Sequence, residues 1–364
     1  MLSPHTYCVI LAGGTETKFW PLSRESRPKP FLGLIPGGKT FLRHTWDRVT
    51  KFVPESNILV VTLRKYKDLV QESIPVIPEA NILCEPYGRN TAPSLAYAAY
   101  TLLSRDPDAV MISTPADLSI SDEVSLLEIL QRASSYAAGS TRLITLGIVP
   151  TSANTNFGYI QMTPGAVAKD EPAGVKTFTE KPDADLAEVF VQSGEFLWNS
   201  GIFIWKASAI IAEMEKHCPE ITRLWTGWEK ALGSDAEKEF IEKVYTDCPN
   251  ISIDYAVMEK SDNTGVYPAD FGWADLGTWN SLYECMKTRD GADNCVITAG
   301  KTIIKNGSGN ILCSRRDGKL VVIDGLSDYI VVDTDDVLVV CPRGQGAIKA
   351  IVSETSMPEF EKYK

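Results

Sequence analysis

The chain has 364 residues, 44% of them hydrophobic, and a formal net charge of -11 at pH 7. This length allows one large domain and a smaller one, and the negative charge argues against binding to nucleic acid or to an anionic membrane surface. No apolar stretch approaches the ~20 residues that span a bilayer, and the N-terminus lacks the pattern of a signal peptide. Eight cysteines without a CxxC pair favour reduced, buried thiols and a cytoplasmic protein.

Strand-like and helix-like segments alternate through the first half of the chain. Apolar runs predict strands over 7–11, 58–61, 110–113 and 143–148. Amphipathic segments between them, such as 41–50 and 92–103, predict helices. This alternation is typical of an α/β fold with βαβ units on a mostly parallel sheet. Because such sheets bind ligands at the carboxyl ends of their strands, we expect the loops after the first and third strands to contribute to a site.

The second half of the chain changes character. Residues 206–260 have apolar side chains at helical spacing. From about residue 291 the pattern changes to short β-rich runs separated by turn signals, over 302–304, 311–314, 320–323, 329–332 and 337–341. We therefore predict two domains, one over 1–290 and a small β-rich domain over 291–364 with a β-helix-like or sandwich fold.

The loop that follows the first strand is the most informative segment. It runs from Leu11 to Leu32 as LAGGTETKFWPLSRESRPKPFL. Gly13 and Gly14 let backbone N–H groups approach a phosphate, and Lys18 and Lys29 can neutralise its charge. The segment is neither a Walker loop nor a dinucleotide fingerprint. It resembles the loop AGGxGxRxxPLSxxxPKxxL of the sugar-nucleotide pyrophosphorylases, and the FWPLSR variant is most similar to the mannose-1-phosphate guanylyltransferases.

Further segments match the same family in the expected order, so that the resemblance extends over residues 7–280. They are EPYGRNTAP (85–93), PADL (115–118), NFGYI (156–160), FTEKP (178–182), WNSGIF (198–203), SIDYAVMEK (252–260) and GWADLGTW (272–279). For residues 1–290 the resemblance implies a Rossmann-like nucleotidyltransferase domain.

The resemblance also implies roles for individual residues. The residues implied to bind the nucleotide come from the first loop and from the EPYGRNTAP segment. They are Leu11, Gly13, Gly14, Glu85, Arg89, Asn90 and Thr91. Sugar-phosphate binding falls to Gly158, Glu180, Lys181 and Asn199. Catalysis falls to Lys18, Lys29, Asp117 and Asp275, with the two aspartates as ligands of Mg²⁺, which favours one or two carboxylates plus phosphate oxygens.

Structural interpretations stay open beside these roles. Thr91 can be the cap of a helix that follows a turn, and Asp117 can form an Asx turn. For Asp254 we expect a helix N-cap. For Glu85 the chemical argument is more specific, since a carboxylate can accept from the N1–H and N2–H₂ edge of guanine, which adenine lacks.

The implied reaction is nucleotidyl transfer from GTP to mannose-1-phosphate, which gives GDP-mannose and pyrophosphate. The attacking phosphate is already anionic at pH 7, because the second pKa of a phosphate monoester is near 6, so no general base is needed. Lys18, Lys29 and Lys181 would offset the remaining negative charge. We expect GTP and mannose-1-phosphate as partners, and a homodimer is possible.

Two departures from the family loop leave alternatives open. Glu16 stands where the family has glycine, and Lys18 stands where it has arginine. A carboxylate at ~4 Å from the triphosphate would repel it by about 4 kcal/mol at an effective dielectric of 20, so we expect Glu16 to point outward. The alternatives are a degenerate nucleotide- or sugar-phosphate-binding regulatory subunit with little turnover, and a nucleotidyltransferase for another sugar-1-phosphate.

Overall fold

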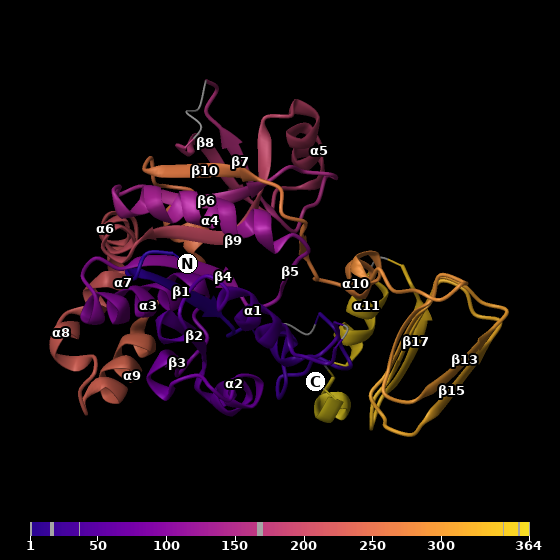
Figure 1. Cartoon of the computed structure of the whole chain (residues 1–364). Helices are drawn as coiled ribbons and strands as arrows, with labels where there is room; N and C mark the ends of the chain where they lie inside the picture. Colours follow the sequence, from indigo (N-terminus) through magenta and orange to yellow (C-terminus); the bar gives the residue numbers. More distant parts are fainter. Residues whose placement is uncertain are drawn as a thin grey trace. The chain divides into compact units, whose positions relative to one another are not determined.

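Packing divides the chain into two compact units. The computed structural model describes residues 2–14, 18–35, 37–165, 170–344, 346–355 and 357–363 (Figure 1). The sheet unit comprises Met1–Gly13, Thr45–Ala116 and Ile120–Trp273, and the coil unit comprises Gly14–His44, Asp117–Ser119 and Ala274–Lys364. The first loop thus belongs to the same unit as the C-terminal residues. The domain boundary near residue 290 stays a prediction.

A nine-stranded sheet forms the centre of the sheet unit. Its strand order is β3-β2-β1-β4-β9-β6-β10-β8-β7. The strands are β1 (Thr6–Leu11), β2 (Ile58–Leu63), β3 (Ile82–Glu85), β4 (Val110–Pro115), β6 (Leu143–Ile148), β7 (Gly158–Met162), β8 (Ala173–Glu180), β9 (Phe196–Lys206) and β10 (Thr264–Ala269). The four neighbouring strands β3, β2, β1 and β4 pair in parallel, and so do β6 and β10. β9 runs antiparallel between β4 and β6. The predicted α/β class is confirmed.

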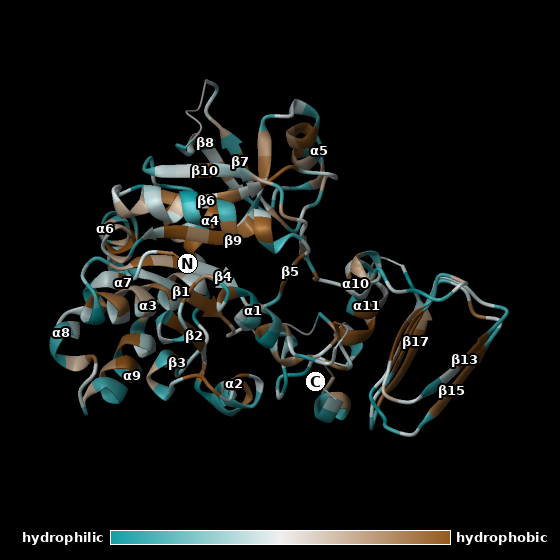
Figure 2. Cartoon of the chain, viewed as in Figure 1, coloured by the Kyte–Doolittle hydropathy of each residue, from teal (hydrophilic) through white to brown (hydrophobic). Residues whose placement is uncertain are grey.

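Helices cover the sheet and explain why its central strands are apolar on both faces. Every residue of β2 is buried, which is typical of a parallel strand with helices on each side. α3 (Thr91–Arg105) packs against β2 and β3, and α4 (Glu123–Ala138) packs against β4, β6, β9 and β10. Figure 2 shows brown, hydrophobic colour along β9 and neighbouring strands and mixed colour on the helices.

The helices predicted over residues 206–260 are confirmed. They are α6 (Ala207–His217), α7 (Pro219–Thr222), α8 (Trp228–Ala231), α9 (Glu237–Asp247) and a π-helical turn, Asp254–Met258. Trp225 is 1% exposed and stacks on Tyr100 of α3, with ring centroids 4.7 Å apart. Other helices and strands before residue 276 are α1 (Phe41–Val49), α2 (Lys67–Ser73), α5 (Ala184–Ser193), β5 (Leu118–Ile120) and β11 (Trp273–Asp275).

Parallel strands stack in the C-terminal part of the coil unit. β12 (Cys295–Thr298), β14 (Ile311–Ser314) and β16 (Tyr329–Asp333) pair in parallel, as do β13 (Lys301–Lys305) and β15 (Leu320–Asp324). β17 (Leu338–Pro342) ends the larger sheet antiparallel to β16. This stacking of successive turns is β-helix-like and excludes the sandwich. Two helices flank the strands, α10 (Trp279–Cys285) and α11 (Ala347–Glu354).

Buried asparagines hold neighbouring turns of this coil together. Asn294 Oδ1 accepts hydrogen bonds from the backbone N–H and the side-chain amide of Asn310, at 3.0 and 2.9 Å, and Asn310 Oδ1 accepts from the backbone N–H of Tyr329. Stacked amides of this kind satisfy backbone groups that the turns leave unpaired.

Two expectations about the chain's environment can be compared with the structure. Among the described residues no helix is long and apolar enough to cross a membrane. All eight cysteines have free thiols, six of them buried, as the sequence predicts.

Candidate functional site

Lys29 lies between two carboxylates in the coil unit. Its Nζ is 2.6 Å from Asp117 Oδ2 and 3.4 Å from Asp275 Oδ1. The lysine side chain is only 2% exposed, whereas the two carboxylates are 23% and 26% exposed. The ammonium also lies 6.0 and 5.6 Å from the ring centroids of Phe19 and Phe41, which attract a cation through their faces. The positive charge is therefore held in place by packing as well as by ion pairing.

Elements far apart in the sequence bring this cluster together. Asp117 follows the end of β4, and Asp275 ends β11 just before α10, whose first turn is capped by Thr278. Lys18 approaches the same aspartate, with Nζ 4.0 Å from Asp275 Oδ2. All four residues predicted to be catalytic thus lie in one cluster. Glu16, which replaces the family's glycine and was expected to point outward, lies outside the described residues. Gly14 is the last described residue before it.

The donor set of this cluster suits a hard cation such as Mg²⁺. Mg²⁺ binds through one or two carboxylates and takes its other ligands from water and phosphate oxygens. Within the described ranges no group of three His, Cys, Asp or Glu side chains could hold a metal ion by itself. A metal bound at Asp117 and Asp275 would therefore take its remaining ligands from water or from phosphate oxygens of a substrate.

A second cluster surrounds Glu85, which ends β3 and is 3% exposed. Ser94 Oγ and Tyr245 OH both donate to its Oε1, at 2.6 and 2.8 Å. Its Oε2 faces Gly13, where a Cβ atom would lie 3.1 Å from it. Burial raises the pKa of Glu85 to about 7, against the opposing effect of the two hydrogen bonds. The free oxygen of this carboxylate is thus beside the glycine that the sequence assigned to the nucleotide.

Side chains of the loop after Glu85 bond to its own backbone and to residues 245–253. Asn90, with φ 67°, is the N-cap of α3, and its side chain accepts from the backbone N–H of Thr91 at 2.9 Å. The interpretation of Thr91 as the cap is wrong, because its hydroxyl instead accepts from the backbone N–H of Ile253. Arg89 donates to the backbone oxygens of Tyr245 and Thr246 at the end of α9, a favourable place for a cation. Leu11 ends β1, and its carbonyl accepts from the backbone N–H of Ala116.

A third cluster contains the residues predicted to bind the sugar phosphate. Glu180 ends β8, and its Oε1 lies 3.3 Å from Lys181 Nζ. Asn199 belongs to β9, and its Oδ1 accepts from Thr145 Oγ1 and from a backbone N–H, both at 3.2 Å. A Cβ atom on Gly158 would overlap Glu180 Oε2, so a larger residue there would displace this carboxylate. The four predicted residues therefore lie together in the sheet unit.

Asp254 joins this third cluster, which sequence reasoning missed. Asn199 Nδ2 donates to Asp254 Oδ1 at 3.1 Å, and the side chain caps no helix, so the expected N-cap role is wrong. Burial and the nearby carboxylate of Glu180 raise the pKa of Asp254, and burial raises that of Glu180 as well. The only signal in the sequence was its place inside the SIDYAVMEK segment.

A separate cleft of about 1000 Å³ lies in the sheet unit. Its walls come from β3, α3, α8 and α9 and include Tyr97, Thr101 and Trp228. None of the residues predicted for nucleotide, sugar or metal lines it.

Comparison with known proteins identifies the family of this chain. Residues 7–290 match the family model described as nucleotidyl transferase. The alginate biosynthesis protein AlgA of Pseudomonas putida is 36% identical over 338 residues, which cover 92% of this chain and 68% of that protein. Mannose-1-phosphate guanylyltransferase RfbM of Salmonella typhimurium is 34% identical over 365 residues, which cover 98% of this chain and 74% of that protein.

A solved structure is similar over almost the whole chain. It is the crystal structure of mannose-1-phosphate geranyltransferase from Thermus thermophilus, with a TM-score of 0.84 and 28% sequence identity. The match covers 97% of this chain and 100% of that one.

Proposed function

Because this chain belongs to the nucleotidyl transferase family, we propose that it transfers a guanylyl group from GTP to mannose-1-phosphate, giving GDP-mannose and pyrophosphate. The observation that carries this proposal is Lys29, held between Asp117 and Asp275 by contacts of 2.6 and 3.4 Å. Two carboxylates and a buried ammonium are the groups that phosphoryl transfer needs, since its catalysis consists mostly of positioning and charge stabilisation.

In this reaction a phosphate oxygen of mannose-1-phosphate attacks the α-phosphorus of GTP, and pyrophosphate leaves. Lys18 and Lys29 offset negative charge on the phosphates in the transition state. Asp117 and Asp275 would hold Mg²⁺, which supplies further positive charge at the phosphate oxygens when it is bound. No side chain needs to take a proton from the attacking group, because that phosphate is already ionised at pH 7.

Glu85 is assigned to the guanine. Its Oε1 is occupied by Ser94 and Tyr245, so Oε2 is the oxygen that can accept from the guanine N1–H and N2–H₂ groups. Since adenine has no such pair of donors, it would leave a buried carboxylate oxygen unpaired. Arg89, Asn90 and Thr91 shape the loop beside Glu85, and the backbone of Leu11, Gly13 and Gly14 approaches the nucleotide.

We predict that Glu85→Gln lowers the preference for GTP over ATP by tenfold or more, since an unpaired buried polar group costs about 1–3 kcal/mol. The test compares kcat/KM for both nucleotides with that of Glu79→Gln, a matched carboxylate that is 75% exposed. Equal preference in both variants and in the unchanged chain would refute the assignment.

The same carboxylate predicts a pH dependence. Since Ser94 and Tyr245 both donate to Oε1, a neutral Glu85 would carry its proton on Oε2, opposite the guanine donors. KM for GTP should therefore rise as pH falls below about 7. For folding the sign is opposite: the raised pKa favours the neutral acid, so its contribution to stability is complete below the ordinary pKa of 4.5 and is lost as pH rises through about 7. Glu85→Gln should remove the pH dependence of KM for GTP between pH 5.5 and 8.

Glu180, Lys181 and Asn199 are assigned to mannose-1-phosphate, with Gly158 giving the space. Asp254 orients Asn199 by accepting from its amide, while the amide oxygen is already held by two donors. We expect Asp254→Leu, which has a similar size but no acceptor, to raise KM for mannose-1-phosphate about tenfold and to leave KM for GTP within twofold, because it removes the hydrogen bond that orients Asn199. Steady-state kinetics with each substrate varied in turn measure both constants, and equal changes in the two would contradict this role.

One assay tests the proposed function against its alternatives. Pyrophosphate release is measured with four nucleoside triphosphates, each combined with mannose-, glucose- and fucose-1-phosphate in the presence of Mg²⁺. Release only with GTP and mannose-1-phosphate supports the proposal, and release with UTP or dTTP and glucose-1-phosphate supports another sugar nucleotidyltransferase. Binding without release supports a regulatory subunit.

Two further proposals concern the protein's setting. Eight free thiols support a reducing compartment, which we take to be the cytoplasm. We also propose a homodimer, which sedimentation of the purified chain tests.

A further inference from the structure

We propose that the C-terminal coil positions the loop that carries Lys18 and Lys29, and that Asp336 does so by holding Arg24. Asp336 lies in the turn between β16 and β17, and Arg24 lies midway between the two lysines. This inference rests on the proposed function for its kinetic consequences only. Neither residue touches the phosphates in the proposed reaction, so both are positioning residues.

The contact between the two residues is bidentate. Arg24 Nη1 donates to Asp336 Oδ2 at 2.8 Å, and Nη2 donates to Oδ1 at 2.6 Å. The arginine side chain is 17% exposed, and its Nε also donates to the backbone oxygen of Pro21. Paired, parallel bonds of this kind fix direction as well as distance, unlike an ordinary surface ion pair.

The geometry of the loop carries this restraint to Lys29. The backbone N–H groups of Arg24 and Arg27 each donate to the carbonyl of the other, at 3.2 and 3.0 Å. Pro28 and the short helix that begins at Lys29 follow at once. A guanidinium fixed on the coil therefore fixes the closed turn that leads into Lys29.

Other contacts attach the same loop to the C-terminal residues. Trp20 Nε1 donates to the backbone oxygen of Tyr363 at 2.8 Å, and Trp279 Nε1 donates to the backbone oxygen of Trp20. Arg315, just after β14, donates to the backbone oxygen of Gly33 at 3.1 Å. The loop is thus bound to the coil at Trp20 and Arg24, which lie between the two lysines, and at Gly33, which follows Lys29.

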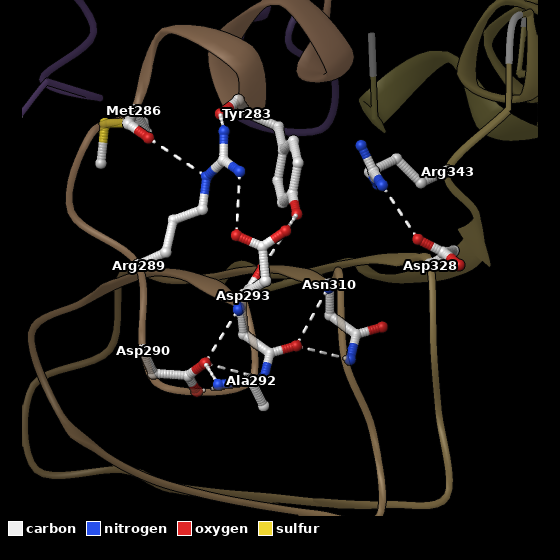
Figure 3. Close-up of polar contacts among 10 residues, drawn as sticks. Tyr283, Met286, Arg289, Asp290, Ala292, Asp293, Asn310, Asp328 and Arg343 are labelled. Carbon is white, nitrogen blue, oxygen red and sulfur yellow. Dashed lines mark hydrogen bonds and ion pairs between the residues drawn. The ribbon is translucent and has the colours of Figure 1, made fainter.

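The helix that follows Asp275 is attached to the coil as well (Figure 3). Tyr283 of α10 donates to Asp293 Oδ2 at 2.7 Å, and the guanidinium carbons of Arg289 and Arg343 lie 4.1 and 3.8 Å from the centroid of its ring. Arg343 also pairs with Asp328. Since α10 begins four residues after Asp275, the coil restrains this carboxylate in addition to the two lysines.

The closing experiment uses the full chain with Asp336→Ala, Arg24→Ala, both together, and the control Asp335→Ala. Asp335 is the neighbouring carboxylate and is 98% exposed. It pairs with Arg316, a residue of the same coil and not of the loop. Each single change at the Arg24–Asp336 pair should lower kcat/KM for GTP about tenfold, as expected for partly exposed charge-assisted bonds. KM for mannose-1-phosphate should stay within twofold, and the double variant should be no worse than either single one.

Hydrogen exchange of the free chain gives a readout that does not depend on turnover. Amides of residues 18–32 should exchange faster in Asp336→Ala than in the unchanged chain and in Asp335→Ala, while amides of β12, β14 and β16 keep their rates. Unchanged exchange over 18–32 overturns the inference, and faster exchange throughout the coil shows a general loss of stability and overturns it too. If the unchanged chain releases no pyrophosphate, the proposed function fails, and exchange alone decides this inference.

Discussion

Replacing either carboxylate beside Lys29 should nearly abolish turnover. We expect Asp275→Asn and Asp117→Asn each to lower kcat at least ~10²-fold, because each removes a charged oxygen ligand of the metal that stabilises charge on the phosphates. The asparagine side chain keeps the size of the aspartate, so packing around Lys29 should change little. The measurement is kcat for pyrophosphate release over a range of Mg²⁺ concentrations, and removal of the metal by a chelator should stop the unchanged chain.

The control for these variants is Asp335→Asn, which removes a carboxylate of the same unit that is 98% exposed. Its kcat should equal that of the unchanged chain. If Asp275→Asn and Asp117→Asn also kept nearly full kcat, the assignment of the metal to these two residues would be wrong. Recovery of kcat at high Mg²⁺ in only one of them would identify the other as the stronger ligand.

The second large effect is expected from Lys29→Met. The methionine fills a similar volume between Phe19 and Phe41 but leaves Asp117 and Asp275 without the ammonium. Loss of a buried positive group aimed at transition-state charge is expected to lower kcat/KM for GTP about 10²- to 10³-fold. The control is Lys39→Met, an exposed lysine in the same part of the chain, which should keep full activity.

Lys29→Met has a second readout that needs no turnover. In the unchanged chain the ammonium competes with a divalent cation for the two carboxylates, so the variant should gain more thermal stability from Mg²⁺ than the unchanged chain does. Melting temperatures measured with increasing Mg²⁺ test this. An equal effect of Mg²⁺ on both proteins, together with near-normal kcat/KM, would exclude Lys29 from the site.

Much of the architecture was predictable because its signals are local. The strands at 7–11, 58–61, 110–113 and 143–148 appear as β1, β2, β4 and β6 with small changes in their bounds, since apolar runs between turns leave few alternatives. The strands after residue 291 were predicted from their spacing, although β12 was missed. β9 was also missed as a strand, because the WNSGIF segment within it was interpreted only as a motif.

Long-range contacts account for what the sequence left undecided. Asp254 has the local pattern of a helix cap, but β9 brings Asn199 to its carboxylate, and the cap is not formed. Arg89 follows Glu85 closely in sequence, yet its guanidinium faces the end of α9. Such partners lie 55 and 156 residues apart in the sequence, and neither propensity nor spacing contains the information that pairs them.

By itself the sequence determined the α/β class, the family and the residue types of the site, because glycines, lysines and carboxylates at fixed spacings keep their chemistry wherever the chain places them. Only the tertiary structure decided that Lys29 lies between Asp117 and Asp275, and that Arg24 is held by Asp336. The physical reason is that an ion pair between distant residues depends on where whole strands and turns pack. Packing is a sum over contacts between distant segments, and no single segment specifies it.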